Sequence, residues 1–142
     1  MTVIDASVWI DYFNGKATAE TEALDSLLGI ESLIVGDLIL VEVLQGFRSD
    51  RDFRQALGLL AALEFREMVG RRVAVASARN YRMLRAQGVT VRKTVDVIIG
   101  TFCILNGHRL LHSDRDFDPM ESYLGLEVVK AFTEDGGRSG GK

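Results

Sequence analysis

The sequence is poor in the residues that usually identify disulfide-rich, zinc-binding or membrane-spanning proteins. It contains one cysteine, Cys103, so no disulfide can form within the chain, and we expect this residue to be a small core side chain. Its two histidines, His108 and His112, are too few for a site built mainly from imidazole. No apolar run approaches the ~18 residues that a transmembrane helix needs, and no basic segment precedes the first apolar residues. We therefore expect a cytoplasmic protein without a membrane segment.

Proline is almost absent as well, since Pro119 is the only one, and the glycines before residue 133 occur singly. No stretch therefore has the composition of a flexible linker between domains, and no internal repeat is present. With 142 residues, 47% of them hydrophobic, the chain has about the length of one domain. We expect one domain over residues 1–132 and a disordered tail over residues 133–142, where four of the ten residues are glycine.

What the sequence does contain is a repeated alternation of short apolar runs with helical patterns. Strands are predicted at residues 3–4, 32–36, 65–69, 109–112 and 126–129, and helices at residues 6–13, 19–28, 38–47, 50–64, 71–87 and 95–106. Asp37 and Thr94 are residue types that cap helix N-termini. Because helices separate the strands and no short hairpin occurs, the sheet should be parallel. We predict an α/β fold, a three-layer α/β/α domain with a central parallel sheet of four to five strands.

Charge is distributed unevenly along the chain. The formal net charge of −3 argues against general affinity for nucleic acid. Residues 1–47, however, hold eight acids and one base, whereas residues 66–93 hold eight bases and one acid. In the helix predicted at residues 71–87, four arginines fall within about 140° of each other on a helical wheel: Arg72, Arg79, Arg82 and Arg85. Such a stripe is either a solvated helix face or an anion-binding surface beside an acidic site.

Four acidic residues each interrupt an otherwise apolar element: Asp5, Glu42, Asp96 and Asp114. Three of them have ordinary structural alternatives, because Asp5 could cap a helix, Asp96 could complement a helix dipole and Asp114 could stabilise a turn. Glu42 is different, since it lies within an almost wholly apolar helix and no base occurs within one turn of it. Burying an unpaired carboxylate there costs several kcal/mol, which a bound cation would offset.

The predicted topology brings these acids to one place. Ligands of parallel α/β sheets bind beyond the carboxyl ends of the strands, where the strand order reverses. Asp5 and Asp114 follow strands, and Asp96 begins a helix at the same rim. Oxygen ligands without a cluster of histidines or cysteines favour Mg²⁺ or Mn²⁺ over zinc.

Four motifs in this order carry a family resemblance: Asp5-Ala6-Ser7 near the N-terminus, Glu42 in the helix after the second strand, Arg92-Lys93-Thr94-Val95-Asp96 at a helix start, and Leu110-Leu111-His112-Ser113-Asp114-Arg115-Asp116-Phe117 near the end. Over about residues 2–130 the chain resembles the PIN-domain ribonucleases. Among these it is most similar to the VapC toxins of prokaryotic toxin–antitoxin pairs. One departure is His112, where the family usually has Thr or Ser.

The resemblance implies that Asp5, Glu42, Asp96 and Asp114 are the catalytic residues and bind Mg²⁺ or Mn²⁺. It implies supporting roles for Ser7, Thr94, Asp116 and Asp118, of which the last two rank below Asp114 because the motif matches its first aspartate to the quartet. The implied activity is endonucleolytic hydrolysis of RNA through metal-activated water, which inhibits translation or growth. Bases near the site would hold RNA phosphates: Arg79, Arg82, Arg92 and Lys93.

The implied partners are RNA, a VapB-like antitoxin and a second copy of the chain, with the apolar helix at residues 38–47 as a candidate dimer surface. Two other hypotheses stay open at this point. One is a catalytically silent PIN fold that only binds. The other is a receiver-type signalling domain, which normally has two adjacent N-terminal acids; Asp5 has no acidic neighbour.

Overall fold

The computed structural model of the chain describes residues 1–131. In chain order the elements are β1 (Thr2–Ile4), α1 (Ala6–Phe13), α2 (Ala19–Leu27), β2 (Leu33–Gly36), α3 (Asp37–Leu44), α4 (Asp50–Ala61), β3 (Glu64–Arg66), α5 (Gly70–Ala86), α6 (Thr94–Asn106), β4 (Arg109–Leu111), the 3-10 helix η1 (Arg115–Phe117) and α7 (Asp118–Leu124). The disordered tail predicted for residues 133–142 lies outside the described residues.

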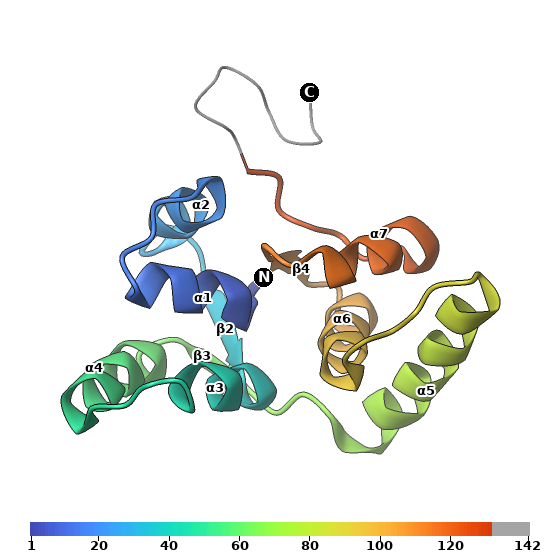
Figure 1. Cartoon of the computed structure of the whole chain (residues 1–142), viewed down its shortest axis with the longest axis horizontal. Helices are drawn as coiled ribbons and strands as arrows, with labels where there is room; N and C mark the ends of the chain where they lie inside the picture. The colour runs from blue at the N-terminus through green and yellow to red at the C-terminus, as the bar shows by residue number, and fades with distance from the viewer. Residues whose placement is uncertain (132–142) are drawn as a thin grey trace.

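The strands form a parallel four-stranded sheet in the order β3-β2-β1-β4. Val3 of β1 pairs with Ile34 of β2 on one side and with Leu110 of β4 on the other. The chain thus moves outward from β1 to β2 and β3 and then crosses back over the sheet to β4. Crossovers that run to either side of β1 place helices on both faces, and Figure 1 shows the strands between α1 and α2 on one side and α5 and α6 on the other. The predicted three-layer α/β fold is confirmed.

Apolar side chains from the sheet and both helix layers form the core. The largest fully buried side chains include Trp9, Phe117, Ile34 and Leu110. Cys103 is also fully buried, and burial raises the pKa of its thiol to about 12, which agrees with the predicted core role. Within residues 1–131, no helix is long and apolar enough to cross a membrane.

The predicted elements near the C-terminus need correction. The fifth strand forms only an isolated bridge, between Leu110 and Val128, so the described sheet has four strands. Residues 114–119, predicted as a turn, contain η1 and the start of α7. The cluster of aspartates around Pro119 resembles a loop in sequence, but proline is compatible with the first turn of a helix, where its missing N–H is not needed.

Both predicted helix caps were also wrong. The residue before α3 is Gly36, and the Asp37 carboxylate instead accepts hydrogen bonds from the N–H groups of Leu38 at 2.9 Å and Met68 at 3.1 Å. Asp37 therefore ties α3 to the segment after β3. Thr94 is the first residue of α6 rather than its cap, and Lys93 occupies the cap position without a capping side-chain bond.

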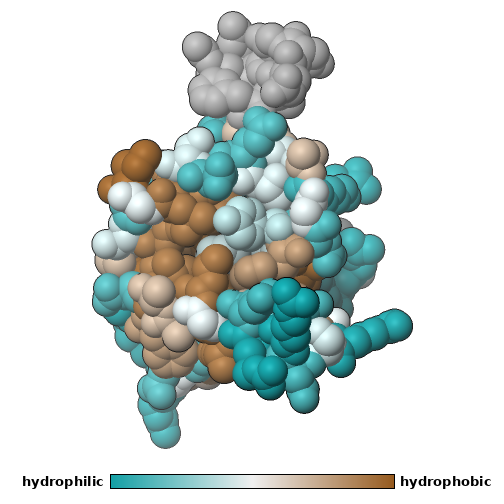
Figure 2. Space-filling model, turned by 90° about the vertical axis from the view of Figure 1, so that its left-hand side faces the viewer, coloured by the Kyte–Doolittle hydropathy of each residue, from teal (hydrophilic) through white to brown (hydrophobic). Residues whose placement is uncertain are grey.

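Most of the apolar side chains of α3 pack against the core. Ile39 and Val43 are buried and Leu38, Leu40 and Leu44 are partly buried, whereas Val41 is 59% exposed. On α4, Phe53 and Leu57 are 37% and 38% exposed. Figure 2 shows hydrophobic residues gathered on the side of the molecule that carries α1, α2 and α4. The chain therefore presents more apolar surface on this half than its own sheet covers.

Candidate metal site at the strand-order reversal

Strand order reverses at β1, because the chain leaves it toward β2 and returns on its other side at β4. Asp5 follows β1 directly, and its N–H donates to the Leu111 carbonyl at the end of β4, at 2.9 Å. Ser7 adds a second link, since its hydroxyl accepts from the Ser113 N–H at 3.1 Å while its own N–H donates to Asp5 Oδ2 at 3.0 Å. The start of α1 and the segment after β4 are thus held together at the crevice where such folds bind ligands.

Three aspartates meet most closely at this crevice. Asp96, Asp114 and Asp116 each offer one carboxylate oxygen, and these atoms all lie within 4.8 Å of one another. Asp96 comes from the first turn of α6 and is only 4% exposed. The segment after β4 is ordered by two local bonds: Asp114 Oδ1 accepts from the Asp116 N–H at 2.9 Å, and His112 Nδ1 accepts from the Asp114 N–H at 3.2 Å. His112 thus helps to position the loop that carries Asp114.

Asp5 and Glu42 act on the same cluster. Burial raises the pKa of Asp96 to about 7, and the charges of Asp5, Asp114 and Glu42 add to this effect, while Lys93 opposes it. Burial and the charge of Asp5 likewise raise the pKa of Glu42. The four acids expected from the sequence therefore come close enough to repel one another, although they derive from four separate parts of the chain.

Asp114 shows the opposite balance. Its burial acts to raise its pKa, but the Asp116 N–H and the Lys93 ammonium group outweigh that effect and hold the pKa below its ordinary value. Asp114 thus stays charged to a lower pH than an ordinary carboxylate, whereas Asp96 keeps its proton up to about pH 7. A cluster with this mixture is poised to exchange a proton for a metal ion.

Two buried carboxylate oxygens in the cluster have no hydrogen-bond partner: Asp5 Oδ1 and Asp96 Oδ2. Buried polar atoms of this kind are rare because leaving them unpaired costs free energy. The donor set consists of carboxylate oxygens alone, which suits hard divalent ions such as Mg²⁺ and Mn²⁺. The residues present therefore fit a divalent metal ion.

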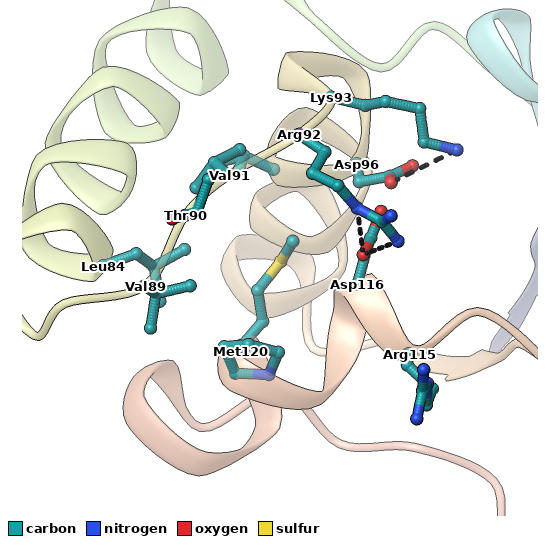
Figure 3. Close-up of a pocket in the computed structure, with 12 residues that line it drawn as sticks. Leu84, Val89, Thr90, Val91, Arg92, Lys93, Asp96, Arg115, Asp116 and Met120 are labelled. Atoms are coloured by element: carbon teal, nitrogen blue, oxygen red, sulfur yellow. Dashed lines mark hydrogen bonds and ion pairs between the residues drawn. The ribbon is translucent and has the colours of Figure 1, made fainter.

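Two cations reach into the cluster from residues 87–93, the strap that connects α5 to α6. The Lys93 ammonium nitrogen lies 3.5 Å from Asp96 Oδ2 and 3.4 Å from Asp114 Oδ2. Arg92 donates from Nε at 3.1 Å and from Nη2 at 2.7 Å to Asp116 Oδ1. Figure 3 shows both side chains turned toward the acids, with the Lys93–Asp96 and Arg92–Asp116 pairs marked. These two bases, expected to bind RNA phosphates, are thus paired with the acids in the structure.

A small pocket adjoins these ion pairs. Its apolar wall comes from the end of α5, the strap and α7, and includes Leu84, Val89 and Met120, which Figure 3 shows opposite the charged residues. The pocket volume of about 70 Å³ equals roughly two water molecules at ~30 Å³ each. It therefore has room for solvent beside the acids.

The family follows from a comparison over most of the chain. A family model for the PIN domain matches residues 2–121. The chain belongs to the PIN domain family. This PIN domain is 29% identical over 134 residues to Ribonuclease VapC11 of Mycobacterium tuberculosis, an alignment that covers 91% of this chain and 98% of the relative.

Solved structures support the same fold. The PIN domain superposes on a structure of VapBC2 from Rickettsia felis bound to a DNA fragment from their promoter, with a TM-score of 0.71 and 13% identity. It also superposes on VapBC-5 of Mycobacterium tuberculosis, a member of the VapBC family of toxin–antitoxin systems, with a TM-score of 0.61 and 21% identity. In both cases 90% of this chain and 96% of the other are covered.

Not every candidate residue lies at the acidic site of this PIN domain. Asp118 is exposed at the start of α7, outside the group of three close aspartates. Thr94 is exposed and lines a different groove, between α5 and α6, together with Tyr81 and Arg82. Arg79 is exposed on α5. Asp116, which the sequence ranks below Asp114, lies in the group of three close aspartates.

Proposed function

We propose that this PIN domain is an endoribonuclease that depends on Mg²⁺ or Mn²⁺ and acts in the cytoplasm as the toxin of a toxin–antitoxin pair. The main support is the convergence of Asp5, Glu42, Asp96 and Asp114 at the strand-order reversal, with buried carboxylate oxygens that lack partners. The likeness to a relative named as a ribonuclease supports RNA as the substrate. We assign the activity to residues 1–132.

In this proposal the four acids hold the metal and the rest of the site positions them. A bound divalent ion supplies an activated water and neutralises charge on the leaving oxygen of the phosphodiester. Ser7 occupies one oxygen of Asp5 through its N–H, which leaves the unpaired Oδ1 for a ligand. Arg92 occupies Asp116, so we assign Asp116 a supporting role and Asp114 the direct one.

RNA cleavage by purified protein tests this proposal. We expect cleavage with Mg²⁺ or Mn²⁺ and none with EDTA, and a loss of about two orders of magnitude or more in Asp5→Asn and Asp96→Asn, because each removes a charged ligand. Asp118→Asn is the matched control, since Asp118 is an exposed acid near the site but outside the cluster. Full activity in both Asp5→Asn and Asp96→Asn would refute the proposal.

We further propose two protein partners. The likeness to VapBC structures supports a VapB-like antitoxin. The exposed apolar side chains of α1, α3 and α4, which include Ile10, Val41 and Phe53, offer it a surface. A second copy of the chain is expected to use part of α3, where Val41 is 59% exposed.

A further inference from the structure

Lys93 holds an unusual position for a residue expected to bind substrate. It is the cap residue of α6, and its ammonium group faces Asp96 and Asp114 at 3.5 and 3.4 Å. The same charge also acts on Glu42. Lys93 therefore lies where a cation bound by this cluster would be expected.

We propose that Lys93 is a built-in counterion, which occupies the cation position among the acids until a divalent metal ion displaces it. The inference rests on the proposed metal site. Lys93 would then set how tightly this chain binds its metal, because every bound ion must first replace the ammonium group.

Lys93 alone neutralises only part of the negative charge of the acids. One positive charge faces several carboxylates, and Asp96 Oδ2 has no hydrogen bond although the ammonium nitrogen is 3.5 Å away. Asp5 Oδ1 also stays unpaired. A doubly charged ion coordinated at roughly 2.0–2.1 Å would interact with these oxygens far more strongly than an ammonium group at its present distance. The exchange of Lys93 for a metal is therefore favourable.

The two cations cannot occupy the site together without strain. The oxygens that face Lys93 are Oδ2 of Asp96 and Oδ2 of Asp114, so a metal ion held by these two carboxylates would compete with the ammonium group for them. Lys93 can leave at low cost, since its side chain is 49% exposed and its stem is flexible. Arg92 differs, because two of its N–H groups hold Asp116. Once displaced, the Lys93 ammonium group stays beside the site, where it can contact a substrate phosphate.

Metal titration of the apo protein tests this inference. Chain freed of metal with EDTA is titrated with MnCl₂ by calorimetry, in the wild type and in Lys93→Met, Lys93→Gln and Lys93→Arg. We expect Mn²⁺ to bind roughly five- to tenfold more tightly to Lys93→Met and Lys93→Gln, because a partly screened competing charge is gone. Lys93→Arg should restore affinity close to that of the wild type. Lys130→Met is the control, since Lys130 pairs with Glu121 at 2.7 Å on the surface.

A thermal measurement provides a second readout. Without metal, Lys93→Met and Lys93→Gln should melt below the wild type, because the acids lose their only close ammonium partner among the pairs of the described residues. Saturating Mn²⁺ should then raise their melting temperature by more than it raises that of the wild type.

The outcomes separate this inference from the proposed function. Tighter Mn²⁺ binding by both neutral variants supports Lys93 as the counterion. If the wild type binds Mn²⁺ and both variants bind equally or more weakly, the counterion role is wrong while the metal site stands. If neither the wild type nor the variants bind Mn²⁺, the metal site itself is wrong and the inference falls with it.

Discussion

Asp96 is a buried acid with a strongly raised pKa, and its protonation should affect the stability of the metal-free chain. Its pKa is about 7 in the folded chain against an ordinary value of 3.8, with burial as the largest cause. Between these two values the folded chain holds a proton that the unfolded chain has released. Stability is therefore greatest at low pH and is lost as the pH rises through the folded pKa.

We expect the melting temperature in EDTA to fall between about pH 4 and about pH 7, the interval between the unfolded and folded pKa of Asp96, and Asp96→Asn to remove most of this dependence. Asp96→Asn should also be more stable than the wild type at the upper pH, because it carries no buried charge. Burial lowers the pKa of His108, so His108 changes stability with pH in the opposite direction. Because His108 is present in both proteins, the difference between their melting curves isolates Asp96. Parallel melting curves across this range would contradict the assignment.

At the residue scale, the sequence predicted that the acids lie together, but it did not predict that Lys93 pairs with them. Asp5, Glu42 and Asp96 stand out because each interrupts an apolar segment, so their charge needs an explanation. Lys93 lies in a polar strap among other bases, where an exposed charge needs none. Its spacing of three residues from Asp96 across a helix start was the available signal.

At the scale of elements, the close packing of β2 against the segment after β3 should depend on Gly36. A Cβ atom added there would lie 2.1 Å from Sδ of Met68, and Met68 is only 1% exposed. We expect Gly36→Ala to destabilise the fold by about 1–3 kcal/mol in denaturant unfolding, because the buried methionine cannot move aside freely.

The double variant distinguishes a clash from other causes. In a Met68→Ala background the space near Gly36 is empty, so Gly36→Ala should cost clearly less than it does in the wild type. An equal cost in both backgrounds would show that the loss arises in the backbone of β2. The Met68→Ala variant alone should be destabilised by roughly 2–5 kcal/mol, as a large buried side chain is removed.

The exposed arginines of α5 give a second prediction at this scale. We expect Arg79→Glu with Arg82→Glu to weaken RNA binding, because the helix lies next to the strap that carries Arg92 and Lys93. If two phosphate contacts are lost, the slope of log K against log salt concentration should become smaller in magnitude by about 1.4. Arg51→Glu with Arg54→Glu on α4 is the charge-matched control. Unchanged affinity and slope would leave the α5 stripe as a solvated face.

Among the elements, the end of α6 is a local signal, whereas the burial of α3 depends on packing. The glycine that ends α6, Gly107, has a φ of 68°, a backbone conformation that the sequence signal anticipates. In contrast, the apolar pattern of α3 predicts burial but not by what. Val41 has the same side chain as the buried Val43, and only the position of the sheet separates them.

At the scale of the molecule, the order of elements determined where the acids meet. Alternating strands and helices predict a parallel sheet, and a doubly wound sheet has one strand-order reversal where side chains from distant segments converge. Residues 1–47 and 66–93, of opposite net charge, meet there, since Glu42 and Lys93 act on each other electrostatically. The sequence could not give the strand order β3-β2-β1-β4, because that order depends on contacts between residues far apart in the chain.

The uncovered apolar side chains of α1, α3 and α4 lead to the last prediction. Val41 is 59% exposed on α3, the helix that also carries Glu42 of the site, so a partner seated on Val41 would lie beside the acids. We expect Val41→Asp to prevent co-purification with the product of the adjacent reading frame while RNA cleavage persists. Met83→Asp is the matched control, since Met83 is 49% exposed on α5.

The same experiment separates an antitoxin from a second copy of the chain. The toxin role is supported if the chain expressed alone stops growth and co-expression of the adjacent product relieves this effect. The Val41→Asp variant should then remain toxic in the presence of that product. If Val41→Asp instead changes only the elution volume of the isolated chain, α3 is a homodimer surface. If no complex forms and growth is unaffected, the toxin role is excluded, whereas the metal-dependent cleavage that Asp5 and Asp96 would support is untouched, because it depends on the acids alone.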